Sequence, residues 1–240
     1  YNGYIAGCFM ENQNQGIDKS LIIPVSGFGN NCGLNCLVHV ICNPVHIEQY
    51  FGPEASGLGM TTGEDILHKY NDMNPENPLY HGVELMQLLQ ENPNPYFRER
   101  LLGPILRQLA IERIEATMNT EKGLAKFYDW IAGPGYEGTG AAVAPADLSA
   151  LKANPSEMFQ YNPLRWFAGS MGIRAIIHSQ WEGMEHNLQD EAVGVERALN
   201  ALVPNPIAEI AIVHEGSANH WEFLGNTEEE VIAHKEKIMI

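Results

Sequence analysis

Residues 21–42 constrain the fold more than any other stretch of this chain. The run from Leu21 to Val25 is apolar and has the character of a short strand, and a turn-forming segment rich in Gly and Asn follows it over residues 26–31. From Cys32 onward, apolar residues recur at helical spacing until Asn43-Pro44, so we predict a helix of about three turns. The sequence therefore places Cys32 where a loop leads directly into a helix.

Residues 52–155 are predicted to be largely helical. Four helical segments are separated by joints rich in Pro, Asn and Gly: Gly63–Tyr70, Val83–Gln90, Tyr96–Met118 and Glu121–Ile131. We interpret this region as a helical lobe inserted between the cysteine helix and the rest of the chain.

The last third of the chain alternates between helix and strand. We predict strands at Ile173–His178, Ile207–His214 and His220–Leu224, and helices at Leu164–Met171, Asp190–Leu202 and Thr227–Ile240. Thr227 is the expected N-cap of the last helix, with Glu230 completing a capping box. The sum is an α/β (α+β) fold with a small central sheet, in which residues 1–51 and 156–240 form the core and residues 52–155 form the inserted lobe.

Composition excludes several classes of protein. The formal net charge of −16 argues against nucleic-acid binding, which requires a basic surface. No apolar run approaches the roughly 18 residues of a membrane span, and no signal peptide is recognisable at the start. Cys32, Cys36 and Cys42 crowd into one helical pattern, which is a poor disulfide framework. We therefore expect free thiols, a reducing compartment and a cytosolic site of action.

Cys32 has the setting of a nucleophile. A thiol attacks at neutral pH only as the thiolate, and a helix start is one of the places where a thiol pKa is lowered. The backbone N–H groups of Asn30 and Asn31 are the expected donors of an oxyanion hole, and Gly33 leaves room where a peptide must approach. The alternative interpretation is that Cys32 is a small buried apolar residue at a helix start.

Two other roles for this helix stay open. The nucleophile could be Cys36, although that residue lies a full turn into the helix and would lose the N–H groups of the loop. Cys32, Cys36 and His39 share one helical face and could bind a metal, but zinc sites usually carry CxxC pairs, and this chain has none. We therefore expect neither a metal nor a cofactor.

His220 is the expected base. It follows a turn of small residues and begins an alternating strand in which His220, Glu222 and Leu224 point to the same side. A carboxylate two residues after a histidine on one strand face can hold the imidazole in the tautomer that catalysis needs. His178 and His214 also end predicted strands but are poorer candidates. The alternative is an exposed strand histidine with an incidental acidic neighbour.

Together, these segments resemble the OTU (ovarian tumour) family of deubiquitinating cysteine proteases, especially its divergent bacterial-effector branch. In that family a loop with Gly and Asn delivers the cysteine to a helix start, as in Gly29-Asn30-Asn31-Cys32-Gly33-Leu34-Asn35-Cys36. The helix and strand from Asn162 to Ile177 resemble the elements ahead of the family's histidine. The terminal strand of the family, in which the histidine is followed by an aromatic residue and an acid or amide, resembles the segment Asn219-His220-Trp221-Glu222-Phe223-Leu224. The order, with cysteine first and histidine last, also agrees.

The resemblance implies a papain-like/OTU-type core that hydrolyses the isopeptide bond after the C-terminal glycine of ubiquitin. Cys32 would attack, His220 would act as the base and Glu222 would orient it, with Gly33 and Trp221 beside the substrate. The inserted lobe would bind ubiquitin or polyubiquitin chains. The protein would be a monomer that acts in the cytosol, either of its own cell or, as a secreted effector, of a host cell.

Two positions depart from the pattern of the family. The usual Asp before the cysteine loop is absent, and Glu222 stands where Asp or Asn is commoner. The third catalytic residue therefore stays open, with Asn219 and Asp18 as the next candidates. The same Cys–His pair would also serve a papain-like peptidase, an amidase or an acyltransferase. A module that only binds ubiquitin and has lost catalysis is the alternative from another class.

Overall fold

The structure is a computed structural model that describes residues 18–118, 144–154, 157, 159, 161–179, 203–215 and 220–239. Its helices in these ranges are α1 (Cys32–Ile41), α2 (Ile47–Phe51), α3 (Gly57–Met73), α4 (Gly82–Glu91), α5 (Pro95–Met118), α7 (Ala144–Ala153), α8 (Tyr161–Ser170) and α10 (Glu228–Ile238). Two short 3₁₀ helices, η1 (Lys19–Leu21) and η2 (Phe28–Asn30), precede α1. The strands are β1 (Ile22–Ile23), β2 (Ile173–Ser179), β3 (Ala208–Glu215) and β4 (His220–Leu224).

The four strands form one mixed sheet in the order β1-β4-β3-β2. Strands β2 and β3 are parallel, whereas β4 runs antiparallel to both of its neighbours, β3 and β1. The short strand β1 pairs only with Phe223 and Leu224, so it does not cover the part of β4 that begins at His220. The edge of β4 at His220 is therefore the place where another element can approach the strand.

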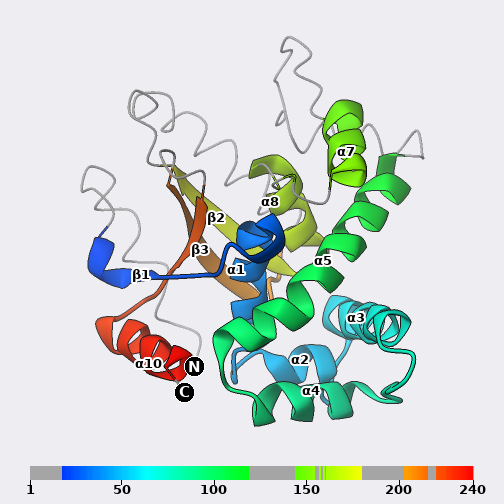
Figure 1. Cartoon of the computed structure of the whole chain (residues 1–240), viewed down its shortest axis with the longest axis horizontal. Coiled ribbons are helices and arrows are strands. Elements are labelled where there is room, and N and C mark those ends of the chain that lie inside the picture. Colours follow the sequence, from blue (N-terminus) through cyan, green and yellow to red (C-terminus); the bar gives the residue numbers. More distant parts are fainter. Residues whose placement is uncertain are drawn as a thin grey trace.

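One face of the sheet packs against α1. Trp221 is buried beside Gly33 of α1, and the Phe223 ring stacks on the ring of His39 at a centroid distance of 6.0 Å. Because side chains alternate along a strand, His220 and Glu222 belong to the opposite face of β4. Figure 1 shows α1 lying in front of the strands, with the long helix α5 crossing beside it.

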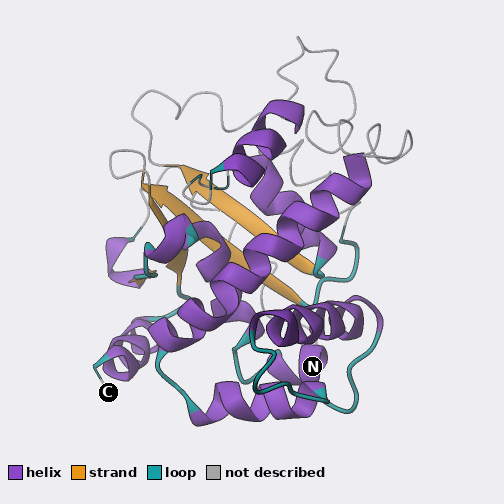
Figure 2. Ribbon diagram, turned by 45° about the vertical axis from the view of Figure 1, so that its right-hand side comes forward, coloured by secondary structure: helices purple, strands orange, loops and turns teal. Residues whose placement is uncertain are grey.

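The helices predicted as an inserted lobe share one buried core with α1 and the sheet. In Figure 2, α5 crosses in front of the strands, while α3 and α4 lie together at one end of the sheet. Helix α5 contributes a row of buried apolar residues: Leu102, Ile105, Leu106, Leu109, Ala110 and Ile114. They belong to the same cluster as the buried residues of α1, α8 and the strands. The described helices of this region, α3, α4, α5 and α7, therefore pack as part of the same body as α1 and the sheet.

The prediction of a mixed α/β fold with a small central sheet is confirmed. The strand predicted from Leu21 to Val25 is limited to β1, because Pro24 has no N–H with which to continue the ladder. The predicted N-cap is present, since Thr227 Oγ1 accepts the Glu230 N–H at 3.2 Å. The predicted helices at 121–131 and 190–202 lie outside the described residues. No helix in the described ranges is both long and apolar enough to span a membrane.

Candidate active site

The loop before Cys32 turns sharply through two residues with positive φ. Gly29 has φ 62° and Asn30 has φ 53°, a left-handed region that glycine enters freely and asparagine tolerates better than most residues. The turn is closed by two backbone hydrogen bonds, from the Asn30 N–H to the Gly27 carbonyl at 3.0 Å and from the Asn31 N–H to the Phe28 carbonyl at 3.2 Å. These two N–H groups are therefore already engaged, which corrects the prediction that they line an oxyanion hole.

The thiol of Cys32 lies against the edge of β4. Cys32 is the first residue of α1 and is almost completely buried, with 2% of its surface exposed. The backbone N–H groups of Trp221, of Gly33 and of Cys32 itself face its sulfur and act to lower the pKa of the thiol. Two of these N–H groups belong to the first turn of α1, where they lack intrahelical partners. The donors that surround the thiol therefore come from two residues later in the chain than Asn30 and Asn31, and from β4.

Burial decides the protonation of this thiol. It raises the pKa of Cys32, and the negative charge of Glu99 adds to the rise, while the three N–H groups act in the opposite direction. The lowering expected at a helix start is therefore outweighed, and the resting group is the neutral thiol. Cys36 is buried more deeply one turn further along α1, and burial raises its pKa well above the ordinary value. Its thiol is accordingly the weaker candidate for a nucleophile.

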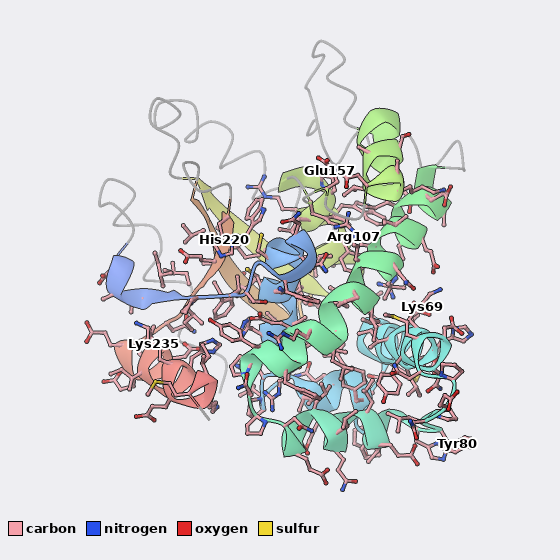
Figure 3. All side chains as sticks on the ribbon, viewed as in Figure 1. Lys69, Tyr80, Arg107, Glu157, His220 and Lys235 are labelled. Atoms are coloured by element: carbon pink, nitrogen blue, oxygen red, sulfur yellow. The ribbon has the colours of Figure 1, made fainter. Side chains whose placement is uncertain are left out.

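The imidazole of His220 is held by a backbone carbonyl. Its Nε2 lies 3.2 Å from the carbonyl oxygen of Val25. A carbonyl oxygen can only accept, so this hydrogen bond requires the proton on Nε2 and leaves Nδ1 with a free lone pair. His220 and Trp221 are adjacent on β4, so the imidazole and the N–H that contacts the Cys32 sulfur share one end of the strand. Figure 3 shows His220 at that end of β4, close to the first turn of α1.

Glu222 lies two residues further along β4 and is partly buried. Its negative charge adds to the pKa rise of Cys36. The role of Glu222 as the orienting residue of His220 stays a prediction. His178 and His214 lie on β2 and β3, opposite Val213 and Trp221 respectively in the strand register. Asn219 lies outside the described residues, and Asp18 accepts two hydrogen bonds from Ser20 in η1.

Gly33 and Trp221 are packed into the core. The Trp221 residue is 1% exposed. A Cβ at Gly33 would lie 2.9 Å from Leu164 Cδ2 and 3.4 Å from Trp221 Cδ1, so the glycine lets α1 pack closely on α8 and β4. The place of Gly33 and Trp221 beside the substrate stays a prediction.

Sequence reasoning missed a buried arginine that anchors the start of α1. The guanidinium of Arg107 donates to Asn31 Oδ1 at 3.3 Å and to the carbonyl of Glu157 at 2.8 Å, and its second nitrogen reaches the carbonyls of Leu151 and Asn154 (Figure 3). Only a planar guanidinium can contact so many acceptors at once. Arg107 therefore ties the residue before Cys32 to α5 and to the end of α7.

The residues proposed as alternative metal ligands are used otherwise. The Nε2 atom of His39 lies 2.7 Å from Glu99 Oε1, and Cys36 is fully buried against the core. Within the parts of the chain that the structure describes, no group of three or more His, Cys, Asp or Glu side chains is arranged to hold a metal ion.

Comparisons with protein-family models, with curated proteins and with solved structures find no significant match to this chain. The class of protein must therefore be argued from the site itself. A cysteine at a helix start, backbone N–H groups of the first helical turn and a nearby histidine are the groups that thiol-dependent acyl transfer requires.

Proposed function

We propose that this protein is a cysteine hydrolase in which Cys32 is the nucleophile and His220 the general base and acid. One observation carries the proposal: Cys32 opens α1 beside Trp221 of β4, the residue next to a histidine whose Nε2 is engaged by Val25. The nearness of the thiol and the imidazole to one end of β4 supports their pairing. A structural cysteine would need only burial and would not need such a neighbour.

The reaction follows from these groups. Nδ1 of His220 takes the thiol proton as the sulfur of Cys32 bonds to the carbonyl carbon of the substrate. The N–H groups of Cys32 and Gly33 stabilise the oxyanion. The imidazolium then protonates the leaving amine as the C–N bond breaks, and water hydrolyses the thioester. Because Cys32 is buried at rest, substrate binding must open the site before the sulfur can attack.

The substrate that we propose is the isopeptide bond after the C-terminal glycine of ubiquitin. The resemblance of residues 29–36 and 219–224 to OTU enzymes supports this choice. The structure adds an exposed surface beside the cysteine loop, where Arg100 of α5 lies over the exposed Phe28 ring at 5.8 Å from its centroid. We assign this Phe28–Arg100 pair, which joins the cysteine loop to the helical region, to ubiquitin binding.

A ubiquitin whose C-terminus carries an electrophile tests the proposal. We expect one covalent adduct on Cys32, its loss in Cys32→Ala, and its retention in Cys36→Ala, the matched buried cysteine of the same helix. Cleavage of a panel of ubiquitin dimers should follow the same pattern. Labelling by a small thiol electrophile but not by the ubiquitin probe would point to a peptidase, an amidase or an acyltransferase. Reversible ubiquitin binding without an adduct would leave a binding module, and an adduct on Cys36 would overturn the assignment of the nucleophile.

A further inference from the structure

A buried carboxylate lies on the far side of the peptide bond that holds His220. Glu99 of α5 has a fully buried side chain, and its Oε2 accepts the backbone N–H of Ser26 at 2.8 Å. That N–H belongs to the same peptide unit as the Val25 carbonyl, which pairs with His220 Nε2 at 3.2 Å. One peptide bond is therefore held from both ends, by a glutamate on α5 and by the histidine on β4.

The geometry of the peptide unit couples these two contacts. The unit is planar, and no cis peptide bond occurs among the described residues, so the C=O of Val25 points opposite to the N–H of Ser26. A group that fixes the N–H therefore fixes the direction of the C=O. The negative charge of Glu99 also polarises the unit and makes its carbonyl a stronger acceptor, because hydrogen bonds in a chain reinforce one another at low dielectric.

Glu99 is itself held in place by a second histidine. Its Oε1 lies 2.7 Å from His39 Nε2 of α1, so both carboxylate oxygens are engaged. The His39 ring is packed between Phe223 of β4, at a centroid distance of 6.0 Å, and His234 of α10, at 4.7 Å. A buried carboxylate is costly unless it is paired and hydrogen-bonded, and this one is both.

The peptide unit is also anchored on its Ser26 side. Asn35 Nδ2 of α1 donates to the Ser26 carbonyl at 2.9 Å and lies 3.3 Å from Ser26 Oγ. Residues 24–26 therefore cannot rotate freely between β1 and the cysteine loop. The Val25 carbonyl keeps one direction, toward the end of β4 where His220 lies.

We propose that Glu99 is a positioning residue of the Cys32–His220 site, acting through the Val25–Ser26 peptide unit. The inference rests on the proposed function for its catalytic consequence. Glu99 orients the peptide, the Val25 carbonyl selects the Nε2–H tautomer of His220, and Nδ1 is thereby left as the base. Glu99 on α5 then orients His220 of the Cys32–His220 pair without touching it, because the Val25–Ser26 peptide unit lies between the carboxylate and the imidazole.

The test reads the His220 tautomer directly. The ¹⁵N shifts of its two ring nitrogens are measured in the resting protein, without substrate, for the parent, Glu99→Leu, Glu99→Gln and Ile114→Ala. Ile114→Ala also empties a buried position of α5, about 22 Å along the helix from Glu99, and serves as the matched control. We expect the Nε2–H tautomer in the parent and the control, and mixed tautomers in Glu99→Leu. Unchanged tautomers in Glu99→Leu would overturn the proposal.

Glu99→Gln separates the orientation of the Val25–Ser26 peptide unit from the effect of the Glu99 charge. It also gives a result if Glu99→Leu fails to fold. Its amide oxygen can still accept the Ser26 N–H, and its amide nitrogen takes the place of the oxygen that faces His39 Nε2. We expect it to keep the Nε2–H tautomer but to move the Nε2 proton resonance upfield, because the uncharged amide polarises the peptide less. An Nε2 proton with the same chemical shift as in the parent would contradict the polarisation of the Val25–Ser26 peptide unit by Glu99.

Turnover of ubiquitin dimers then gives the catalytic consequence. Glu99→Leu should lower kcat by about 10- to 100-fold with KM within about twofold, and Glu99→Gln should recover most of the loss. Ile114→Ala should leave both constants near those of the parent. If neither the parent nor any variant cleaves ubiquitin dimers but the His220 tautomer still changes with Glu99, the proposed function fails and the positioning role of Glu99 stands. If the parent cleaves ubiquitin dimers and the tautomer does not change with Glu99, only the positioning role fails.

Discussion

The carbonyl oxygen of Val25 lies 3.2 Å from Nε2 of His220, although the two residues are 195 positions apart in the chain. This contact gives the imidazole the orienting partner for which the sequence suggested a side chain. Glu222 was the first choice, and Asp18 instead caps its own turn by accepting hydrogen bonds from Ser20. Because the partner is a backbone atom, substitution of Val25 cannot remove it, and its contribution to catalysis is tested by substitution of the side-chain candidates.

Removal of the Glu222 carboxylate should therefore harm catalysis only mildly. If the Val25 carbonyl fixes the tautomer, Glu222→Ala should lose less than about tenfold in kcat/KM, or about 1.4 kcal/mol of transition-state stabilisation. His220→Ala should approach the inactivity of Cys32→Ala. Steady-state kinetics on ubiquitin dimers measure all three. A loss of a hundredfold or more in Glu222→Ala would return the orienting role to its carboxylate.

The sequence was sufficient to place the elements that carry the candidate pair. The helix that begins at Cys32 is visible because apolar residues recur at helical spacing up to Asn43-Pro44, and α1 spans Cys32–Ile41. The strand of His220 is visible from its alternation, and β4 spans His220–Leu224. Both are local patterns, which the residues of one segment decide by themselves.

The contacts that complete the site could not be predicted in the same way. Val25 acts through its carbonyl, which every residue possesses, so its identity gives no signal. Glu99 and Arg107 are charged residues in a long helix and by composition belong on a solvated face. They are buried because α1, α5 and the end of α7 converge, which is decided by residues 50–76 positions apart. Such burial is a property of tertiary packing and not of any local spacing.

The three cysteines of α1 and its C-terminus should differ in reactivity. Burial raises the pKa of Cys32, raises that of Cys36 well above the ordinary value and raises that of Cys42 to about 12. Among these three cysteines of the folded protein, alkylation by iodoacetamide should therefore be slow at pH 7, should accelerate toward alkaline pH and should occur at Cys32 first. Peptide mass spectrometry assigns the site, and unfolding in urea should expose all three. Modification of Cys36 ahead of Cys32 would contradict the structure.

Charge reversal at Arg100 should weaken substrate binding more than chemistry. Arg98 and Arg107 donate to backbone carbonyls within the fold, whereas Arg100 is exposed beside Phe28. We expect Arg100→Glu to raise KM for ubiquitin dimers by roughly three- to tenfold at low salt, with kcat nearly unchanged. Gln108→Glu adds a negative charge at another exposed position of α5 and is the control. Equal KM values for the two variants would exclude the Phe28–Arg100 pair from the binding surface.

A methyl group at Gly33 should disturb the core behind the thiol. It would meet Leu164 Cδ2 at 2.9 Å and Trp221 Cδ1 at 3.4 Å, so Gly33→Ala should cost about 1–3 kcal/mol of unfolding free energy through overpacking. At Gly27 no atom lies within 4 Å of the added Cβ, so Gly27→Ala should change stability by less than about 0.5 kcal/mol. Urea denaturation gives both values. Probe labelling should fall only in Gly33→Ala, because the added methyl group displaces α1, which begins at Cys32, from Trp221.

The packing of α10 should make stability depend on pH. Burial lowers the pKa of His234 from 6.5 to about 4, helped by the charges of His39 and Lys237 and opposed by a hydrogen bond with the Pro24 backbone. Between pH 6.5 and 4 the unfolded chain binds a proton on this ring that the folded protein does not bind. The free energy of unfolding must therefore fall as the pH is lowered through this window, with no further contribution from His234 below it.

Replacement of His234 by a side chain that does not titrate isolates this contribution. In His234→Gln the loss of unfolding free energy between pH 7 and pH 4 should be smaller than in the parent by about 1–2 kcal/mol, a value reduced for the partial exposure of the ring. Urea titrations at the two pH values measure the difference. His68→Gln, at a histidine of α3 whose side chain is 74% exposed, is the control and should change the difference by less than about 0.5 kcal/mol. If His234→Gln loses as much stability as the parent over this range, the ring is not held neutral by its packing against His39.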